Sequence, residues 1–204
     1  MKKMNVSKFR HNLITKGAIM MLMKWLRENV YAAGLLFVLR VYVGWTWLTA
    51  GFHKLTGGFD ATGFLKGAIA KPAMDKATNE LIYPTFTAFL QNFALPNVKL
   101  INFMIPLGEF LVGLGLILGT LTTAAAFFGL MMNFMFLFAG TVSTNPWMVL
   151  LGFIVLAAGA NAGKFGGDYY VLPYLRKAFR KLNKGGDGHD PNKTAGGTRA
   201  PMGV

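Results

Sequence analysis

The arginine at position 40 constrains the fold more than any other residue, because it lies inside an apolar segment of membrane-spanning length. From Tyr31 onward the chain is apolar for about 20 residues, the length of helix that crosses a hydrocarbon core about 30 Å thick. Arg40 is the only charged residue in that segment. A guanidinium group facing lipid costs at least about 2.5 kcal/mol. Arg40 is therefore expected to face the interior of a helix bundle and to have a polar partner there.

The composition is that of an integral membrane protein. Of the 204 residues, 53% are hydrophobic and only 14% are charged. The formal net charge of +13 is concentrated at the two ends of the chain, which is typical of cytoplasmic flanks that contact anionic lipid rather than nucleic acid. Cysteine is absent, so the chain itself cannot carry out disulfide or thiolate chemistry.

Three further apolar runs follow the first, and short polar breaks separate them, so consecutive helices are expected to be antiparallel neighbours. The runs are Leu100 to Leu118, Leu121 to Val142 and Pro146 to Ala162. The predicted fold is an all-α integral membrane protein, an antiparallel four-transmembrane-helix bundle spanning residues 31–172. Basic residues before the first run and after the fourth place both termini in the cytoplasm by the positive-inside rule.

The remaining segments are expected to form interfacial amphipathic helices. Residues 1–30 predict a basic cytoplasmic helix on the membrane surface, with a partly disordered tail as the alternative. The outer loop at 56–99 predicts one short helix capped by Asp60 and a second that opens at Pro84 and stops before Pro96. These two helices form either a lid over the bundle or a layer resting on the bilayer. Residues 173–204 predict a basic amphipathic segment followed by a disordered tail from Gly185.

Few polar residues interrupt the apolar runs, and these are the candidates for chemistry. Counting along the helices at 1.5 Å per residue, Arg40 lies about 13 Å from the inner end of its helix, and Glu109 about 12 Å from the outer end of the next. We therefore expect an ion pair between Arg40 and Glu109 near mid-membrane, with Asn133 in the same layer. The alternative is that these three residues only hold the helices together. Asn161 is a further buried candidate.

Aromatic residues surround Arg40 in the sequence, and an apolar cavity with a few polar groups is the usual form of a small-molecule site. Trp45 and Trp47 are the candidates to contact a ligand. His53 ends the first helix beside Lys54 and is either a proton relay or an interface anchor. Asp168 either pairs with a basic residue or serves a turn. The histidines are scattered, so no metal site and no haem motif is predicted.

Three segments together resemble the DoxX/DoxD family of small four-helix bacterial membrane proteins. They are Arg40 with GWTWLTAGFHKL, GEFLVGLGLILGTLTTAAA from Gly108 to Ala126, and NAGKFGGD from Asn161 to Asp168. The resemblance implies a location in the bacterial cytoplasmic membrane. It also implies a link to quinone chemistry, since the family includes the DoxD subunit of a thiosulfate:quinone oxidoreductase.

The leading functional hypothesis is a quinone-binding redox subunit that works with a soluble or membrane redox partner. Arg40 would stabilise negative charge on a quinone oxygen, Glu109 would exchange protons with it, a tryptophan would stack on the ring and Asn133 would orient it. The alternative is a non-catalytic membrane anchor for a redox or stress-response partner. A small-solute permease is less well supported, because four helices leave little room for alternating access unless the chain forms a homo-oligomer.

Overall fold

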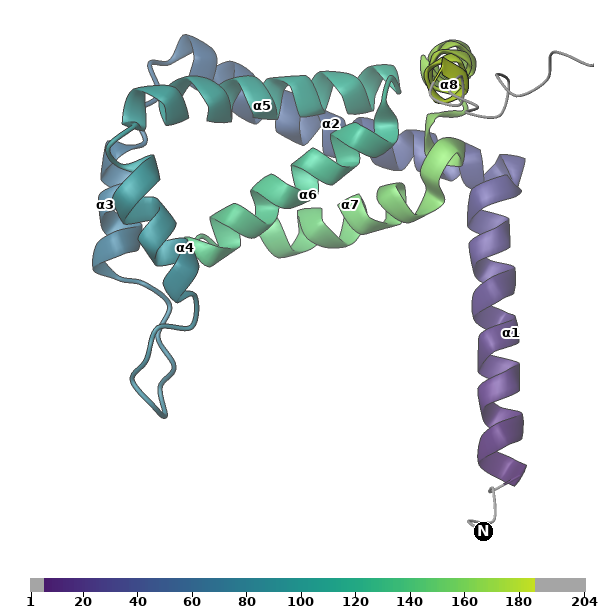
Figure 1. The fold of residues 1–204 in the computed structure, drawn as a ribbon, viewed down its shortest axis with the longest axis horizontal. Helices are drawn as coiled ribbons and strands as arrows, with labels where there is room; N and C mark the ends of the chain where they lie inside the picture. Colours follow the sequence, from purple (N-terminus) through teal and green to yellow (C-terminus); the bar gives the residue numbers. More distant parts are fainter. Residues whose placement is uncertain (1–5, 186–204) are drawn as a thin grey trace, which may run out of the picture. The chain divides into compact units, whose positions relative to one another are not determined.

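The computed structural model describes residues 6–185. Within that range the regular structure is helical, apart from one isolated antiparallel bridge between Met74 and Leu81 (Figure 1). The elements are α1 (Val6–Glu28), α2 (Val30–Thr56), α3 (Thr62–Ala70), α4 (Pro84–Phe89), the π-helical turn η1 (Leu90–Ala94), α5 (Val98–Leu118), α6 (Thr122–Phe138), α7 (Asn145–Ala158), the 3₁₀ turn η2 (Gly159–Gly163) and α8 (Asp168–Gly185). The tail predicted from Gly185 lies almost entirely outside the described residues.

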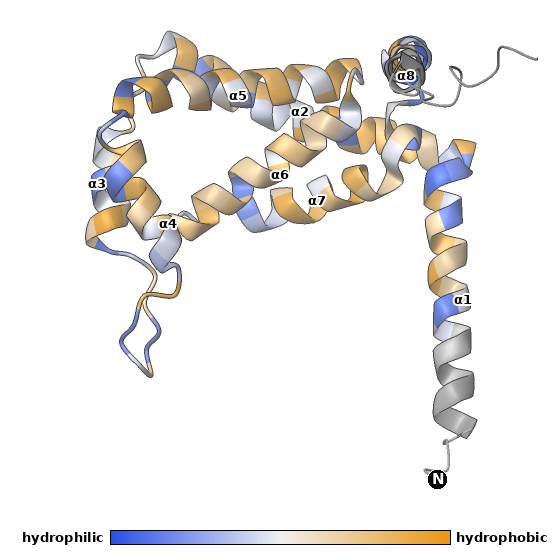
Figure 2. Cartoon of the chain, viewed as in Figure 1, coloured by the Kyte–Doolittle hydropathy of each residue, from blue (hydrophilic) through white to orange (hydrophobic). Residues whose placement is uncertain are grey.

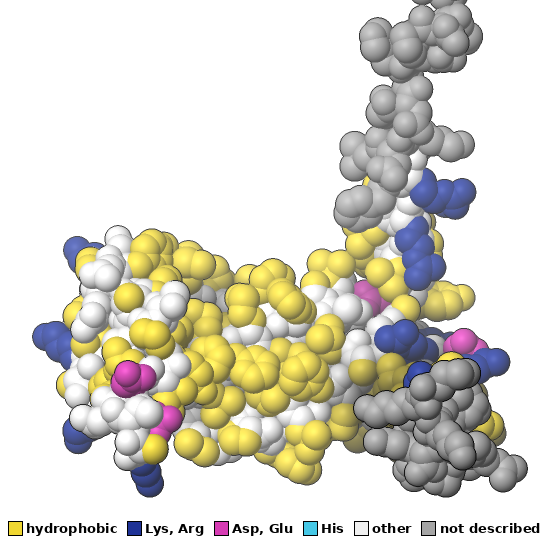
Figure 3. All heavy atoms as spheres, turned by 60° about the horizontal axis from the view of Figure 1, so that its bottom comes forward, with side chains coloured by type: hydrophobic (Ala, Val, Ile, Leu, Met, Phe, Trp, Pro, Cys, Tyr) yellow, Lys and Arg dark blue, Asp and Glu magenta, His cyan; other side chains and the backbone are white. Residues whose placement is uncertain are grey.

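Three helical segments of the described chain are long and apolar enough to cross a membrane. They are Val30–Thr56, Val98–Leu118 and Asn145–Gly163. Apolar residues run along the whole length of these helices (Figure 2), and their side chains form a broad exposed band over the middle of the surface (Figure 3). A water-soluble protein does not expose so large a continuous apolar surface. The chain is therefore a membrane protein.

The third predicted run, Leu121 to Val142, is shorter as a helix than expected. α6 ends at Phe138 and has 17 residues. Gly140 has a positive φ of 86°, the Thr141 N–H donates to the Phe136 carbonyl and the Gly140 N–H donates to the Leu137 carbonyl. This is a glycine-terminated helix end, which satisfies the last carbonyls and stops the helix.

Close contact between glycines and backbone joins α2 to α5 in an antiparallel pair. A Cβ atom at Gly113 would lie 2.3 Å from the Leu48 nitrogen, and one at Gly51 would lie 2.4 Å from the Phe110 nitrogen. Only glycine allows the two backbones to approach so closely. α6 and α7 form the second close pair, and the two pairs diverge toward the end where α3 and α4 lie (Figure 1).

The two short helices predicted in the outer loop are present. Asp60 accepts hydrogen bonds from the Thr62 N–H at 3.0 Å and the Thr62 hydroxyl at 2.7 Å, at the start of α3. These bonds, with one from Asn102, lower the pKa of the Asp60 carboxyl. α3 and the α4–η1 segment share a small apolar core made by Ala61, Leu65, Leu90 and Ala94. The loop is therefore a folded layer; its position at the bilayer interface stays a prediction.

From Tyr170 onward α8 belongs to a compact unit of its own. Its exposed side chains include three basic residues, Arg176, Lys177 and Arg180, and two tyrosines, Tyr170 and Tyr174. This composition agrees with the basic amphipathic segment predicted from the sequence, and its contact with a membrane surface stays a prediction.

Candidate functional site

Arg40 is fully buried, and its partners are backbone carbonyls. Nη1 donates to the carbonyl oxygens of Leu116 at 2.5 Å and Ile117 at 3.0 Å, and Nη2 donates to that of Phe165 at 2.7 Å. The last carbonyls of a helix lack intrahelical donors and carry the negative end of the helix dipole. Arg40 thus caps the end of α5 and ties it to the segment before α8.

The predicted ion pair between Arg40 and Glu109 is wrong, because the two residues lie at different levels of the α2–α5 pair. Gly51 faces the backbone from Pro106 to Phe110, whereas Gly44 faces Gly113. Between Arg40 and Gly51 the helix rises about 16 Å. Counting from the helix ends places both charges near the middle, but the glycine contacts fix a register that separates them.

Glu109 instead pairs with Lys54, which lies in the last turn of α2. The distance from Lys54 Nζ to Glu109 Oε1 is 2.5 Å. The Glu109 side chain is 2% exposed and that of Lys54 is 30% exposed. The Lys54 ammonium also lies over the rings of Phe59 and Phe136, at 5.3 and 5.5 Å from their centroids. The second carboxylate oxygen, Oε2, is buried and has no hydrogen-bond partner.

A cavity of about 420 Å³, here called the polar cavity, adjoins this pair. It lies where the α2–α5 and α6–α7 pairs diverge, and residues of α2, α3, α5, α6 and α7 line it. Its aromatic lining consists of Trp47, Phe59, Phe64 and Phe136, and its polar lining of Thr46, Lys54, Glu109, Asn133, Thr141, Ser143, Thr144 and Asn145. Its volume and its mixture of aromatic and polar groups are those of a small-molecule site.

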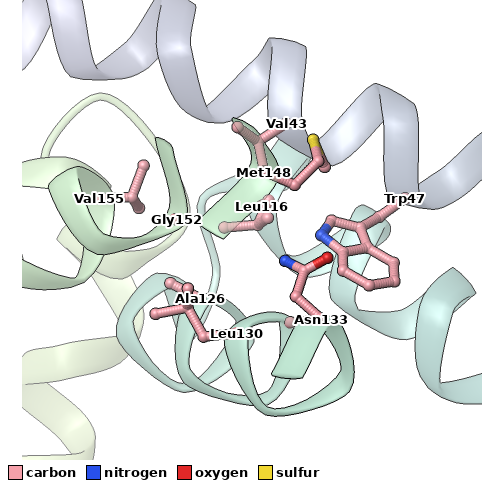
Figure 4. Close-up of a pocket in the computed structure, with 10 residues that line it drawn as sticks. Val43, Trp47, Leu116, Ala126, Leu130, Asn133, Met148, Gly152 and Val155 are labelled. Carbon is pink, nitrogen blue, oxygen red and sulfur yellow. The ribbon is translucent and has the colours of Figure 1, made fainter. Parts of the chain in front are cut away.

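The inner end of the polar cavity is closed by tight packing. A void of only about 10 Å³ continues between the helices, and Trp47, Asn133 and Met148 line both spaces (Figure 4). A single water molecule needs about that much room. The Asn133 amide lies beside the Trp47 indole (Figure 4) and has no hydrogen-bond partner among the described residues. Asn133 is thus a buried amide free to bind a ligand at the base of the polar cavity.

The structure brings together only some of the residues predicted for the site. Glu109, Trp47 and Asn133 line the polar cavity. Trp45 is 62% exposed on the apolar surface, and His53 is exposed next to Phe52. Neither Trp45 nor His53 lines the polar cavity, so the structure places both away from it.

Asn161 and Asp168 are buried but hold the chain together away from the polar cavity. The Asn161 amide donates to the carbonyls of Leu26 at 2.9 Å and Asn29 at 3.0 Å. The Asp168 carboxylate accepts from the N–H groups of Leu121 at 2.6 Å and Thr122 at 3.0 Å, where α6 begins. Asp168 also interacts electrostatically with Arg40. Both predicted candidates therefore have structural partners.

Sequence reasoning missed Lys54 as the partner of Glu109, although a signal was available. Trp47, Gly51 and Lys54 follow a spacing of four and three residues, which puts them on one face of a helix. That face also carries Arg40. Among the described residues, no group of three His, Cys, Asp or Glu is arranged to hold a metal ion.

These features define a helical membrane protein with a ligand-sized cavity beside a buried ion pair. A family model described as DoxX matches residues 35–143, which is more than half of the chain, and the chain therefore belongs to the DoxX family. The match includes Lys54, Glu109 and Asn133 and excludes Asn161 and Asp168. Comparison with curated proteins and with solved structures finds no match.

Proposed function

We propose that this protein is a membrane quinone-binding redox subunit and that the quinone headgroup binds in the polar cavity. The observation that carries the proposal is the Lys54–Glu109 ion pair, because both of its residues line a cavity of about 420 Å³. An ion pair beside an aromatic-lined space can donate hydrogen bonds to a polar headgroup and exchange protons with it. The DoxX/DoxD resemblance makes a quinone the leading ligand class.

The residues that line the polar cavity fit the two oxygens and the flat ring of a quinone. Lys54 Nζ has donors beyond the one used by Glu109 and would donate to one ring oxygen. The Asn133 amide, at the base of the cavity, would donate to the other. Trp47 and Phe136 supply flat apolar surfaces for the ring. Arg40 has no part in this site, because it does not line the polar cavity and its Nη1 and Nη2 donate to carbonyls elsewhere.

A quinone supplies the capacity to accept two electrons and two protons when it is reduced. On this chain, the Glu109 carboxyl would pass the two protons to the ring oxygens one after the other and be reprotonated from solvent in between, while Lys54 would hold the carboxylate in place. The electrons would come from a partner protein that carries a flavin, a haem or an iron–sulfur cluster, since no binding motif for these groups is found in this sequence.

We further propose that α6 crosses the membrane along with the three longer segments, which gives four crossings and places both termini in the cytoplasm. Seventeen residues of α-helix span about 26 Å, slightly less than the hydrocarbon core, and a bilayer adapts to such a difference at small cost. In this topology the polar cavity opens toward the outer half of a bacterial cytoplasmic membrane.

The test is quinone binding by purified protein in nanodiscs, measured as the excess over empty nanodiscs so that partitioning into lipid cancels. Glu109→Gln and Lys54→Met are the test variants. Glu80→Gln and Lys66→Met, which change exposed residues of the outer loop, are the matched controls. We expect each test variant to weaken binding about tenfold, the usual effect of losing a hydrogen bond to a charged group, and each control to leave it unchanged.

Unchanged quinone affinity in both test variants would show that the polar cavity is not the quinone-binding site. Quinone-linked turnover in membranes, measured with the same variants, then separates binding from proton exchange. If Glu109→Gln binds a quinone normally but turns over slowly, Glu109 handles the proton. If turnover is also normal, Glu109 is not part of the mechanism.

A second candidate is a non-catalytic membrane anchor for a redox or stress-response partner. The exposed basic residues of α8, Arg176, Lys177 and Arg180, favour it, because a cationic surface docks acidic partners. Replacing all three by glutamine should abolish co-purification of the partner if the anchor function holds. Partner binding that survives this change would leave the quinone site as the better account.

A further inference from the structure

The polar cavity has a charged side and a neutral polar side. Lys54 and Glu109, from the α2–α5 pair, form the charged side. The neutral side is made by α6, α7 and the turn between them, with Asn133, Thr141, Ser143, Thr144 and Asn145. Residues 141–145 are here called the α6–α7 turn. Lys54, Glu109 and Asn133 have roles in the proposed quinone site, whereas the α6–α7 turn has none in it.

Hydrogen bonds and positive φ angles define the backbone of the α6–α7 turn. Ser143 has a φ of 37°, and Gly140, just before the turn, has a φ of 86°. The Asn145 N–H donates to the Val142 carbonyl at 3.0 Å, which closes the turn at the start of α7. A positive φ is unfavourable for a residue other than glycine, and residues held in such conformations cluster at ligand sites. The α6–α7 turn is therefore a suitable place for a residue that binds a ligand.

The side-chain amide of Asn145 is held in one orientation. Asn145 is 9% exposed, and its Nδ2 donates to the Thr141 carbonyl at 2.9 Å. A carbonyl oxygen only accepts hydrogen bonds, so the nitrogen of the amide, and not its oxygen, must face Thr141. The oxygen, Oδ1, has no donor among the described residues. Asn145 thus offers the polar cavity, which it lines, a hydrogen-bond acceptor in a fixed position.

The two redox forms of a quinone differ in what they offer such an acceptor. A quinone oxygen only accepts hydrogen bonds, whereas each hydroxyl group of a hydroquinone both donates and accepts. Lys54 can donate to either form, but only the hydroquinone can donate to Asn145. Asn133, which is 2% exposed and has no partner among the described residues, offers a donor and an acceptor and so suits both forms. An acceptor that one ligand pairs and another leaves unpaired discriminates between the two.

We propose that the polar cavity binds the hydroquinone form of its ligand more tightly than the quinone form, and that Asn145 is the residue responsible for this preference. The inference rests on the proposed function and extends it from the class of ligand to the redox form that the site retains. Asn145 Oδ1 accepts a hydrogen bond from a ring hydroxyl, and this bond is absent when the ring is oxidised. Asn145 is thus a specificity-determining residue that contacts the ligand.

The test compares the affinities of two redox forms of one ring, tetramethyl-1,4-benzoquinone and its hydroquinone, for purified protein in nanodiscs. Both are measured without oxygen, as the excess over empty nanodiscs, with a reductant present for the hydroquinone. The measured quantity is the ratio of the two dissociation constants, which does not depend on the fraction of protein that is folded. We expect the unmodified chain to bind the hydroquinone about fivefold more tightly, the usual effect of one neutral hydrogen bond.

Two variants of Asn145 separate its acceptor from its contact with Thr141. Asn145→Leu removes both and should bring the ratio close to one. Asn145→Asp keeps an acceptor oxygen but loses the amide donor, and it should keep the preference. The matched control is Asn97→Leu, because the Asn97 amide donates in the same way to the carbonyl four residues earlier, that of Phe93, at 2.8 Å. Asn97 is exposed and does not line the polar cavity, so this control should leave the ratio unchanged.

The outcomes distinguish this inference from the function on which it rests. Equal affinity of the unmodified chain for both forms, or tighter binding of the quinone, would overturn the preference and leave the quinone site standing. An unchanged ratio in Asn145→Leu would overturn the role of Asn145. A ratio near one in Asn145→Asp would also overturn it, because the contact with Thr141 rather than the acceptor would then set the preference. Failure of the unmodified chain to bind either form would overturn the proposed function and this inference together.

Discussion

Arg40 and Glu109 are buried charges on the same pair of helices, yet their surroundings differ in kind. Arg40 donates from Nη1 and Nη2 to three carbonyls, its Nε is buried without a partner, and it lines neither the polar cavity nor the void beneath it. Glu109 keeps one buried oxygen unpartnered and borders the polar cavity. Arg40 is enclosed by the backbone carbonyls that it holds together and stabilises the fold, whereas Lys54 and Glu109 border an open cavity and are therefore suited to a ligand.

The largest effect is expected from Arg40→Met, which tests the structural half of this comparison. It leaves the carbonyls of Leu116, Ile117 and Phe165 without their donor, and each buried acceptor left unsatisfied costs about 1–3 kcal/mol. Thermal unfolding in nanodiscs should show a large loss of stability. Arg40→Lys should recover only part of it, because an ammonium cannot reproduce the fork of the guanidinium.

Quinone binding per folded molecule tests whether Arg40 also belongs to the binding site. We expect Arg40→Lys to bind a quinone with the affinity of the unmodified chain, since Arg40 lies about 16 Å along α2 from the level of Glu109. A stable Arg40→Lys protein with lost quinone affinity would break the comparison and return Arg40 to the site.

Helix positions follow from the sequence because their causes are local. The apolar runs place α2, α5 and α7 within a few residues, and Asp60 and Pro84 mark the starts of the loop helices. The end of α6 was missed because a positive φ at Gly140, inside an apolar run, stops the helix. Hydropathy alone does not report that turn.

The partners of the buried charges do not follow from the sequence in the same way. Carbonyl oxygens accept from Arg40, and every residue carries a carbonyl, so no residue type signals the contact. The register between α2 and α5 depends on backbone contacts at Gly44, Gly51 and Gly113. Trp47, Glu109 and Asn133, three of the residues singled out from the sequence, line the polar cavity, and their part in binding stays a prediction. Glu109 and Asn133 are conspicuous in the sequence because polar residues in a membrane helix are rare.

The second largest effect on stability is expected from removing the charge of Lys54 or of Glu109. Lys54→Met leaves Glu109 as a buried acid without its cation and should cost about 1–3 kcal/mol. Adding Glu109→Gln to it removes the unpaired charge and should return stability to within about 1 kcal/mol of the unmodified chain. Denaturant unfolding of the two single variants and the double variant measures this coupling.

The double variant should still fail to bind a quinone, although it is stable. This separation of stability from binding is the result that distinguishes the Lys54–Glu109 pair from Arg40. If the double variant binds normally, the pair is a structural contact as well, and the two buried charges no longer differ in role.

A smaller loss of stability is expected from Asp168→Ala, which tests a second structural contact near Arg40. The Asp168 carboxylate caps the start of α6 through the N–H groups of Leu121 and Thr122, and removing such a cap costs about 1 kcal/mol. Thermal unfolding should show this loss with no change in quinone affinity. Asp75→Ala removes a comparable turn contact, to the Ala77 N–H in the outer loop, and should have a smaller effect.

The smallest expected effect is a pH dependence at Asp60, on the outer loop that covers the cavity end of the molecule. Bonds from the Thr62 hydroxyl and N–H and from the Asn102 amide lower the pKa of the Asp60 carboxyl in the folded chain. A group with a lowered folded pKa stabilises the fold fully above its unfolded pKa of about 3.9, and this contribution is lost as the pH falls through the folded pKa. Asp60→Ala should therefore unfold α3 more readily than the unmodified chain at pH 6, and the difference should shrink at pH 3. Limited proteolysis of the α2–α3 connection at both pH values measures this difference, with Glu80→Ala as the control. If the difference in cleavage rate between Asp60→Ala and the unmodified chain grows toward pH 3, the charged carboxylate does not hold the loop in place.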